Sequence, residues 1–202
     1  MSDLFEKFLS IPTASIAFAQ DDSGVVDPEI KPMWKPISLI GTALTIDTVP
    51  GDNLAVHVAI SEAPKGSVIV LDTKYHKKNA CVGDIIIRNS IKKGIAGFVT
   101  NGVMRDLKDC RELGLPIYAT GICMRGPSKS DNEAIIGKSI IFGGVSIDNG
   151  DYIIGDDDGL VVVKKDKFEV VLKKAIEREN IEKEIINRIN NGENTKDIFN
   201  LS

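Results

Sequence analysis

The sequence predicts a mixed α/β fold, and three features of its 202 residues support this prediction. Amphipathic segments and short apolar segments alternate between residues 52 and 120, which is typical of helices and strands that build a parallel sheet. After residue 137 the pattern changes to neighbouring strands joined by a tight turn, which indicates antiparallel pairing. From residue 166 the sequence indicates one long helix. We therefore expect one sheet that contains both parallel and antiparallel strands.

The first 120 residues contain the alternating elements. A short helix is expected at residues 3–10, and the proline-containing stretch 11–35 is expected to be irregular. The strands are rich in apolar and β-branched residues, and we expect them at 38–49, 67–72, 95–100 and 116–120. The helices between them are expected at 52–63, with Asp52 as the N-cap, and at 84–93 and 106–113, which end at Gly94 and Gly114.

The remaining residues predict a hairpin and the long helix. Residues 138–147 and 151–155 flank Asp148-Asn149-Gly150, and because Asn-Gly is a strong turn signal we expect these two strands to pair. A last strand is expected at 160–163, and the helix then begins with Asp166 and Glu169 as its capping residues. Its apolar stripe comprises Phe168, Val171, Leu172, Ile176, Ile185, Ile186 and Ile189. No linker interrupts the pattern, so residues 1–202 are expected to form a single domain.

Composition and charge narrow the range of possible functions. The net charge is −4 at pH 7 and the pI is about 5.3, so we expect no nucleic-acid partner, because such proteins usually present a basic surface. No apolar run approaches the roughly 20 residues that span a bilayer, so no membrane association is expected. The first residues lack the pattern of a secretory signal, and the three cysteines form no CxxC pair. We therefore expect a cytoplasmic protein in a reducing environment.

One spacing indicates a candidate site. Asp84 follows Gly83 at the start of a predicted helix, and Arg105-Asp106 follows the next predicted strand, 21 positions after Asp84. Unpaired N–H groups at a helix start attract anions, and Gly83 lets a ligand approach the backbone closely. Arg105 can bind a carboxylate with two parallel hydrogen bonds, and Asp106 offers the hard oxygen ligand that Mg²⁺ or Mn²⁺ prefers. Together these groups suit a keto acid and a divalent cation.

Each of these residues also has a plain structural explanation. Asp106 could cap the helix that follows it, Asp84 could be a first-turn acid, and Arg105 and Asp106 could form a surface ion pair. His57 and His76 have no second His or Cys at metal-ligand spacing, so we expect both to be surface or core histidines.

The order Asp84, twenty intervening residues, Arg105-Asp106 and then Asp109 resembles the signature of the class II pyruvate aldolases, which include 4-hydroxy-4-methyl-2-oxoglutarate aldolase. The resemblance covers most of the chain and includes the strings at residues 50–55, 114–119 and 156–163. The same fold is shared by the regulator of ribonuclease activity A, whose relatives usually have Gly where this chain has Asp84. The resemblance implies an αββα sandwich with a mixed β-sheet core, and homotrimers or hexamers with sites between subunits.

The resemblance also implies a reaction and a role for each residue. Asp106 would bind Mg²⁺, Mn²⁺ or another divalent cation, Arg105 would hold the carboxylate or keto oxygen of the substrate, and Asp84 would orient a metal-bound water or carry a proton. The pyruvyl carboxylate would be bound by the backbone amides of Gly83, Asp84, Ile85 and Ile86. The implied activity is cleavage of 4-hydroxy-2-keto acids to pyruvate, with oxaloacetate decarboxylation as a side activity.

The chain departs from the family near its N-terminus, where Phe18 replaces an acid. If that acid lines the pocket, the site of this chain is less polar. The family also uses acids from a neighbouring subunit, and Glu177, Glu179 and Glu184 are the candidates for that role. The competing hypothesis is a non-catalytic regulator that binds a ribonuclease or a helicase, which the acidic charge balance permits.

Overall fold

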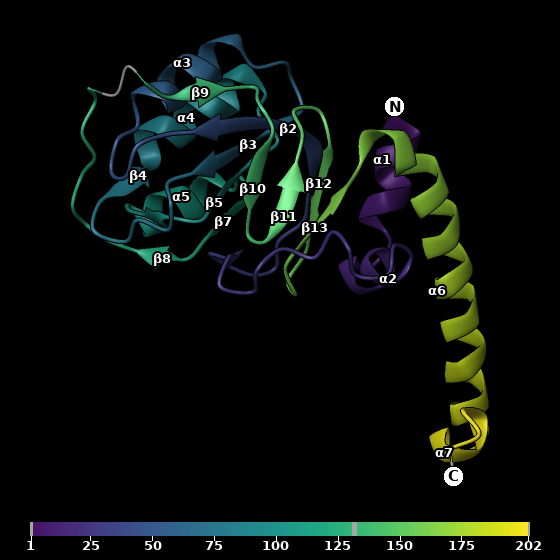
Figure 1. Ribbon diagram of the computed structural model, residues 1–202. Coiled ribbons are helices and arrows are strands. Elements are labelled where there is room, and N and C mark those ends of the chain that lie inside the picture. Colours follow the sequence, from purple (N-terminus) through teal and green to yellow (C-terminus); the bar gives the residue numbers. More distant parts are fainter. Residues whose placement is uncertain (1, 131–132, 202) are drawn as a thin grey trace.

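A computed structural model of the chain describes residues 2–130 and 133–201 (Figure 1). The helices are α1 (Ser2–Leu9), α2 (Thr13–Phe18), α3 (Leu54–Glu62), α4 (Asp84–Lys93), α5 (Leu107–Leu113), the 3₁₀ turn η1 (Lys165–Lys167), α6 (Phe168–Asn190) and α7 (Thr195–Ile198). The strands are β1 (Lys31–Pro32), β2 (Leu39–Asp47), β3 (Ser67–Asp72), β4 (Ala80–Val82), β5 (Gly97–Thr100), β6 (Val103–Met104), β7 (Ile117–Ala119), β8 (Gly121–Ile122), β9 (Ile135–Ile136), β10 (Ile140–Phe142), β11 (Val145–Ile147), β12 (Tyr152–Gly155) and β13 (Leu160–Val163).

The central sheet joins parallel and antiparallel strands, as the sequence predicts. Its strands lie in the order β1-β7-β5-β3-β2-β12-β13, and β9 pairs with the end of β2. Strands β2, β3, β5 and β7 run parallel, whereas β12 is antiparallel to both β2 and β13. The alternating helices and strands of the first half of the chain therefore form the parallel part of the sheet.

Strand β3 lies inside the sheet and is buried on both faces, since every residue from Ser67 to Asp72 is buried. Ile69 and Leu71 face one hydrophobic cluster, and Val68 and Val70 face the opposite one. This alternation follows from the two-residue period of a strand. Because each large aliphatic side chain contributes roughly 1.5–3 kcal/mol when fully buried, β3 anchors both halves of the core.

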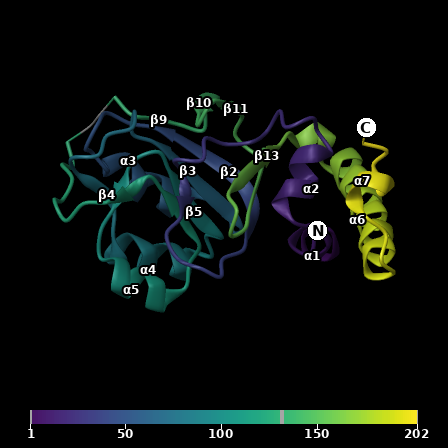
Figure 2. The same ribbon diagram turned by 90° about the horizontal axis from the view of Figure 1, so that it is seen from below.

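Helices cover one face of the central sheet in two groups (Figures 1 and 2). Helices α3, α4 and α5 pack over the parallel strands, in a cluster that includes Ile60, Ile87 and Phe98. Helices α1, α2 and the start of α6 pack over β12 and β13, where Phe8 and Phe168 stack with 4.3 Å between ring centroids. The pair β10–β11 and the chain near residues 26–37 cover the opposite face. The expected mixed α/β sandwich is confirmed.

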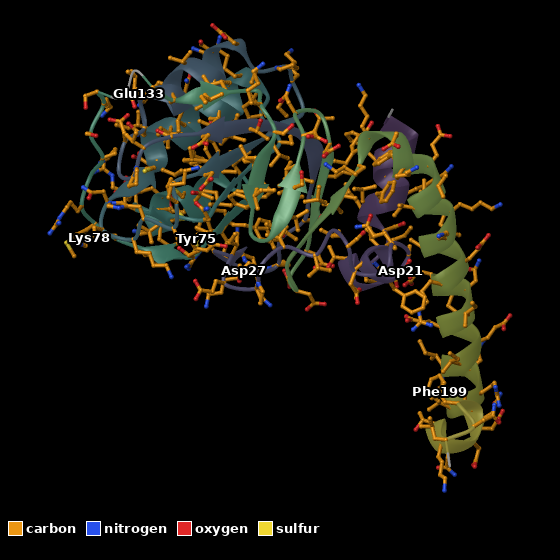
Figure 3. All side chains as sticks on the ribbon, viewed as in Figure 1. Asp21, Asp27, Tyr75, Lys78, Glu133 and Phe199 are labelled. Atoms are coloured by element: carbon orange, nitrogen blue, oxygen red, sulfur yellow. The ribbon has the colours of Figure 1, made fainter. Side chains whose placement is uncertain are left out.

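The predicted long C-terminal helix is also confirmed, but it leaves the body of the protein after its first turns (Figure 1). Phe168, Val171, Leu172 and Ala175 are buried. Of the later residues of the predicted apolar stripe, Ile176, Ile186 and Ile189 are exposed and Ile185 is half-buried. Figure 3 shows the side chains of this distal part, with Phe199 near its end, standing apart from the core. Within the described ranges no helix, α6 included, is long and apolar enough to cross a membrane.

Residues 11–35 are not wholly irregular, contrary to the prediction. Thr13–Phe18 form α2, and Lys31–Pro32 pair with β7 as β1. Helix α2 forms because Ile16 and Ala17 are buried in the cluster shared with α6. Pro12 does not prevent this, because it occupies the N-cap, where its missing N–H interrupts no helical hydrogen bond.

The hairpin predicted around Asp148-Asn149-Gly150 is wrong. Strands β10 and β11 instead pair with each other around Gly143-Gly144, and β12 turns back onto β13. Gly143 and Gly144 both have positive φ, at 53° and 79°, which a tight hairpin turn requires. Asn149-Gly150 lies in the turn that connects β11, in the two-stranded sheet, to β12, in the central sheet.

Two predicted helix caps are also wrong. Asn53, and not Asp52, occupies the N-cap position of α3, although Asp52 Oδ1 accepts a 2.8 Å hydrogen bond from the Leu54 amide. Helix α6 begins at Phe168 with Lys167 at its N-cap, so Asp166 belongs to η1. In both places a short turn precedes the helix and moves its start along the chain.

Candidate functional site

A second, smaller sheet brings the candidate residues together. Strands β4 and β6 run parallel within the three-stranded sheet β4-β6-β8, and Val82 pairs with Met104. The next residues along each strand are Gly83-Asp84 and Arg105-Asp106, so both pairs emerge at the same edge. The Arg105 amide continues the pairing with a 3.0 Å hydrogen bond to the Val82 carbonyl. Two segments that are distant in sequence thereby become direct neighbours.

Helix α4 begins at this edge with free backbone donors. Gly83 is its N-cap, and the first intrahelical bond runs from the Ile87 amide to the Gly83 carbonyl at 3.1 Å. The amides of Asp84, Ile85 and Ile86 therefore have no helical partner. The Asp84 amide reaches Asp106 Oδ2 at 3.4 Å, a long contact that a better acceptor could replace.

Asp106 stands at the N-cap position of α5, but its side chain makes no capping hydrogen bond. Its φ of 57° is left-handed, a conformation uncommon for residues other than glycine. Asp106 Oδ2 lies 3.3 Å from Arg105 Nε, and both side chains are about one-third exposed, at 34% and 38%. The carboxylate therefore faces the α4 start and not its own helix, which argues against a role as a simple cap.

Two glycines make room for this pair. A Cβ atom at Gly83 would lie 2.7 Å from Asp106 Oδ2 and 3.2 Å from Arg105 Nε. A Cβ atom at Gly126 would lie 2.8 Å from Arg105 Nη1. Any side chain at either position would displace the guanidinium or the carboxylate, so the two glycines are required by close approach.

The carboxylate of Asp84 faces its own helix. Arg88, one turn later on α4, donates from Nε to Asp84 Oδ2 at 3.3 Å. The Asp84 side chain is 27% exposed and lines the same pocket as Arg105 and Asp106. The structure thus brings together all of the predicted site residues, with Asp84 contacting Asp106 through its backbone amide.

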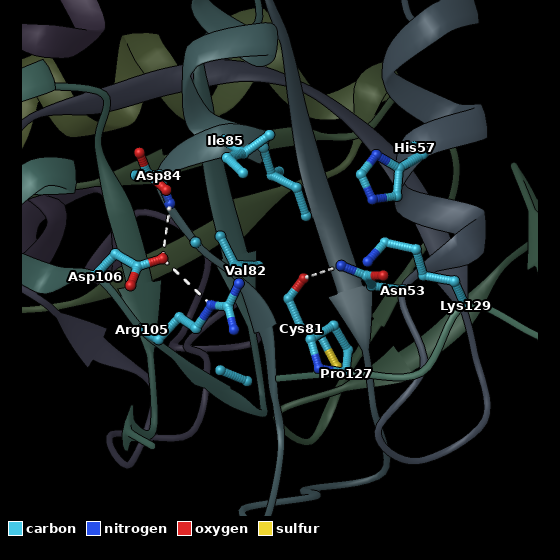
Figure 4. Close-up of a pocket in the computed structure, with 13 residues that line it drawn as sticks. Asn53, His57, Cys81, Val82, Asp84, Ile85, Arg105, Asp106, Pro127 and Lys129 are labelled. Carbon is cyan, nitrogen blue, oxygen red and sulfur yellow. Dashed lines mark hydrogen bonds and ion pairs between the residues drawn. The ribbon is translucent and has the colours of Figure 1, made fainter. Parts of the chain in front are cut away.

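The pocket at this edge has a volume of about 150 Å³ and two opposed walls (Figure 4). Asp84, Arg105 and Asp106 form one wall. Figure 4 shows His57, Asn53 and Lys129 across from them, on α3 and on the loop after β8. A molecule in the pocket would therefore contact charged groups from both sides.

The wall formed by α3 carries two buried polar atoms, Asn53 Oδ1 and His57 Nε2, that have no hydrogen-bond partner in residues 2–130 and 133–201. Asn53 is only 3% exposed, and its Nδ2 donates to the Cys81 carbonyl at 3.1 Å. Burial, followed by the positive charge of Lys129, lowers the pKa of His57. The imidazole is therefore neutral at pH 7.

Sequence reasoning missed this wall, because His57 was expected to be an ordinary surface or core histidine. A signal was available: Asn53 and His57 are four residues apart at the start of α3, so they lie on one side of the helix. His76, in contrast, has a partner, since its Nε2 lies 3.1 Å from Asn79 Oδ1.

The donor atoms near Asp106 fit a hard divalent cation. Asp106 Oδ2 takes both contacts described above, and Oδ1 has no partner in residues 2–130 and 133–201. In the same ranges no three side chains of His, Cys, Asp or Glu gather into a ligand cluster. Mg²⁺ commonly uses one or two protein carboxylates and retains several waters, so a single free carboxylate oxygen is compatible with it.

The other residues considered from the sequence lie elsewhere. Phe18 is 60% exposed, and the guanidinium carbon of Arg178 lies 4.5 Å above the centre of its ring. Glu179 accepts a 2.6 Å hydrogen bond from Ser15. Like Glu177 and Glu184, it lies on α6 and does not line the pocket of its own chain. Phe18 therefore does not make this pocket less polar within one chain.

Comparison with known proteins identifies the family of the chain. A family model described as RraA-like, Aldolase/RraA, matches residues 4–162. The chain belongs to the RraA-like family. A relative from Halalkalibacterium halodurans, whose name assigns it provisionally as a 4-hydroxy-4-methyl-2-oxoglutarate aldolase, is 39% identical over 173 residues. That alignment covers 86% of this chain and 82% of the relative.

Solved structures share the fold of this chain. An uncharacterized protein from Pseudomonas syringae superposes with a TM-score of 0.85 and 27% identity, over 96% of this chain and 91% of that one. RraAS2 of Streptomyces coelicolor, described as an unusual member of the RNase ES inhibitor RraA family, has a TM-score of 0.82 and 25% identity, over 93% and 98%. The family resemblance found in the sequence is thus confirmed.

Proposed function

We propose that the chain is a divalent-cation-dependent aldolase that cleaves 4-hydroxy-2-keto acids, such as 4-hydroxy-4-methyl-2-oxoglutarate, to pyruvate. The observation that carries this proposal is the convergence of Arg105, Asp106 and the start of α4 on one pocket. The name of the Halalkalibacterium relative supports the substrate class. The fold alone would not, because one fold hosts many functions.

In this proposal the pocket binds the keto-acid end of the substrate first. The amides of Gly83, Asp84, Ile85 and Ile86 receive the pyruvyl carboxylate, because a helix start provides free donors and a partial positive charge. Arg105 donates to the carboxylate or to the keto oxygen. The long contact from the Asp84 amide to Asp106 is then exchanged for a shorter contact to substrate.

Asp106 would hold Mg²⁺, Mn²⁺ or a similar cation through its free oxygen. A cation bound there would polarise the keto group and stabilise the enolate charge. Asp84, oriented by Arg88, would accept a hydrogen bond from a water molecule in the pocket. When the bond between C3 and C4 breaks, Arg105 and the α4 amides already face the oxygen on which negative charge develops. Protonation at C3 then yields pyruvate.

We also propose that the working unit is a homotrimer or hexamer. Glu177, Glu179 and Glu184 lie on the helix that projects from the body of the protein, away from their own pocket. In an assembly one of these acids could reach the site of a neighbouring subunit. A second carboxylate would bind the cation more tightly than Asp106 alone.

The test is pyruvate release by the wild-type protein. We expect turnover of 4-hydroxy-4-methyl-2-oxoglutarate with added Mg²⁺ or Mn²⁺, and slower decarboxylation of oxaloacetate, because both reactions pass through pyruvate enolate. EDTA should abolish both activities, and excess cation should restore them. Turnover that persists in EDTA would contradict the cation requirement.

The second candidate function is a non-catalytic regulator that binds a ribonuclease or a helicase. The likeness to the Streptomyces protein, whose description names an RNase inhibitor family, favours it. Asp84 argues against it, because regulator-like members usually have Gly at this position. If no 4-hydroxy-2-keto acid is turned over with any divalent cation, the regulator becomes the better explanation.

A further inference from the structure

The α3 side of the pocket carries two polar side chains, Asn53 and His57, that take no part in the proposed binding of the keto acid by Arg105 and the start of α4. Asn53 Oδ1 and His57 Nε2 are both buried and both lack a partner among the described residues. A buried polar atom without a hydrogen bond destabilises the folded state, so native proteins rarely keep two such atoms together. Both residues line the pocket, and a molecule inside it could satisfy both atoms.

The orientation of each group is fixed by its surroundings. The amide nitrogen of Asn53 donates to the Cys81 carbonyl at 3.1 Å, so the carboxamide oxygen must be the atom that is left over. In His57, Nε2 is buried and unpartnered within the part of the chain that the structure describes, so Nδ1 can hold the single proton of a neutral ring. Two acceptor atoms then face the pocket, and a water molecule has two hydrogens to donate to them.

We propose that Asn53 and His57 hold this water and that His57, through it, is the base that removes the proton from the C4 hydroxyl during carbon–carbon cleavage. The inference rests on the proposed aldolase function and deepens it by naming the proton acceptor. His57 lies opposite Arg105 and Asp106, across the pocket in which the substrate would extend from its keto-acid end (Figure 4). Asn53 is a positioning residue, and His57 carries the proton.

The step balances without any further reactant. The hydroxyl proton passes to the water, and a proton of that water passes to Nε2 of His57. The C4–O bond becomes a carbonyl, the bond between C3 and C4 breaks, and its electron pair forms the pyruvate enolate. The imidazolium then returns the proton through the water to C3, so pyruvate and a carbonyl product leave and the ring is neutral again.

The charged groups that line the pocket with His57 are Asp84, Arg105, Asp106 and Lys129, and the thiol of Cys81 is also present. Burial and Lys129 lower the pKa of His57 from its ordinary value of 6.5. The ring is therefore unprotonated and ready to accept a proton at neutral pH. Cys81 cannot compete for this role, because burial raises the pKa of its thiol to about 11.

Oxaloacetate can be used to test whether His57 acts as a base or only helps to bind the substrate. Its C4 is a carboxylate, so loss of CO₂ gives the enolate without removal of a hydroxyl proton. A base is needed for aldol cleavage only, whereas Arg105 and the α4 amides serve both reactions. Loss of the base should therefore slow cleavage and leave decarboxylation nearly unchanged.

The decisive experiment compares His57→Gln and His57→Phe, with His76→Gln as the matched control outside the pocket. We expect kcat for cleavage of 4-hydroxy-4-methyl-2-oxoglutarate to fall by about 10²–10⁴ in both variants, the usual contribution of general acid–base catalysis. Decarboxylation of oxaloacetate and the melting temperature should change little. Glutamine keeps a hydrogen bond to the water but cannot take its proton, so it should rescue KM and not kcat.

Three results would overturn the inference. These are equal losses of both activities in the His57 variants, a His57→Gln enzyme with normal kcat for cleavage, and a His76→Gln enzyme that loses cleavage to the same degree. If the variants do not fold, the wild-type pH profiles decide. Cleavage must lose activity in acid, at a pH lower than the ordinary histidine pKa because the pKa of His57 is lowered, and decarboxylation must not share that loss. A wild-type protein without any turnover would instead refute the proposed function itself.

Discussion

Replacing Arg105 by alanine is expected to lower kcat/KM for pyruvate formation by roughly 10²–10³, from both 4-hydroxy-4-methyl-2-oxoglutarate and oxaloacetate. The guanidinium lies between Gly83 and Gly126, at positions where a Cβ atom would meet it at 3.2 Å and 2.8 Å. It is therefore held where it can face the oxygen on which charge develops. A loss of this size corresponds to about 2.7–4 kcal/mol of transition-state stabilisation.

Two comparisons make the result specific to position 105. Arg111→Ala changes an exposed arginine in the last turn of α5 and should leave the rate unchanged. Arg105→Lys keeps the charge but loses the planar fork, so it should recover only part of the activity. An Arg105→Ala enzyme with a normal rate would show that the arginine does not contact the reacting group.

Replacing Asp106 by asparagine is expected to remove tight cation binding and nearly all turnover. The side chain would keep its size, but the negative charge beside Arg105 would be lost, and with it the only carboxylate assigned to the cation. A catalytic cation contributes several kcal/mol, so kcat should fall by about 10²–10⁴. Calorimetric titration with Mn²⁺ measures the loss of binding directly.

Glu112→Gln is the matched control for this variant, because Glu112 is an exposed acid on the same helix. It should bind Mn²⁺ and turn over substrate like the wild type. If Asp106→Asn bound Mn²⁺ with unchanged affinity, the cation would have to lie elsewhere. In that case Asp106 would serve only to orient Arg105.

The parallel core of the fold could be predicted from the sequence, because local patterns and long-range packing agree there. Strand β3 is apolar throughout and is buried on both faces, and α4 lies between Gly83 and Gly94, as its sequence indicates. The hairpin predicted around residues 148–150 is wrong because local pattern and long-range packing disagree there. Asn149-Gly150 is a good turn, but β12 finds better partners in β2 and β13.

The residues of the candidate site could be predicted from the sequence, but the strands that bring them together could not. The spacing of Asp84, Arg105 and Asp106 predicts that they meet at one edge of a sheet, without saying which sheet. They meet at the end of β4 and β6, two strands of three and two residues that are too short to give a periodic signal. Asn53 and His57 were overlooked because only the fold reveals that their free atoms face the same pocket.

A crystal structure with pyruvate and Mg²⁺ tests the central claim most directly. We expect the cation beside Asp106, the pyruvate carboxylate on the amides at the start of α4, and the guanidinium of Arg105 within hydrogen-bond distance of pyruvate. The methyl group of pyruvate, which stands for C3, should point toward His57. Pyruvate bound away from this pocket, or a cation that does not touch Asp106, would contradict the proposed aldolase site.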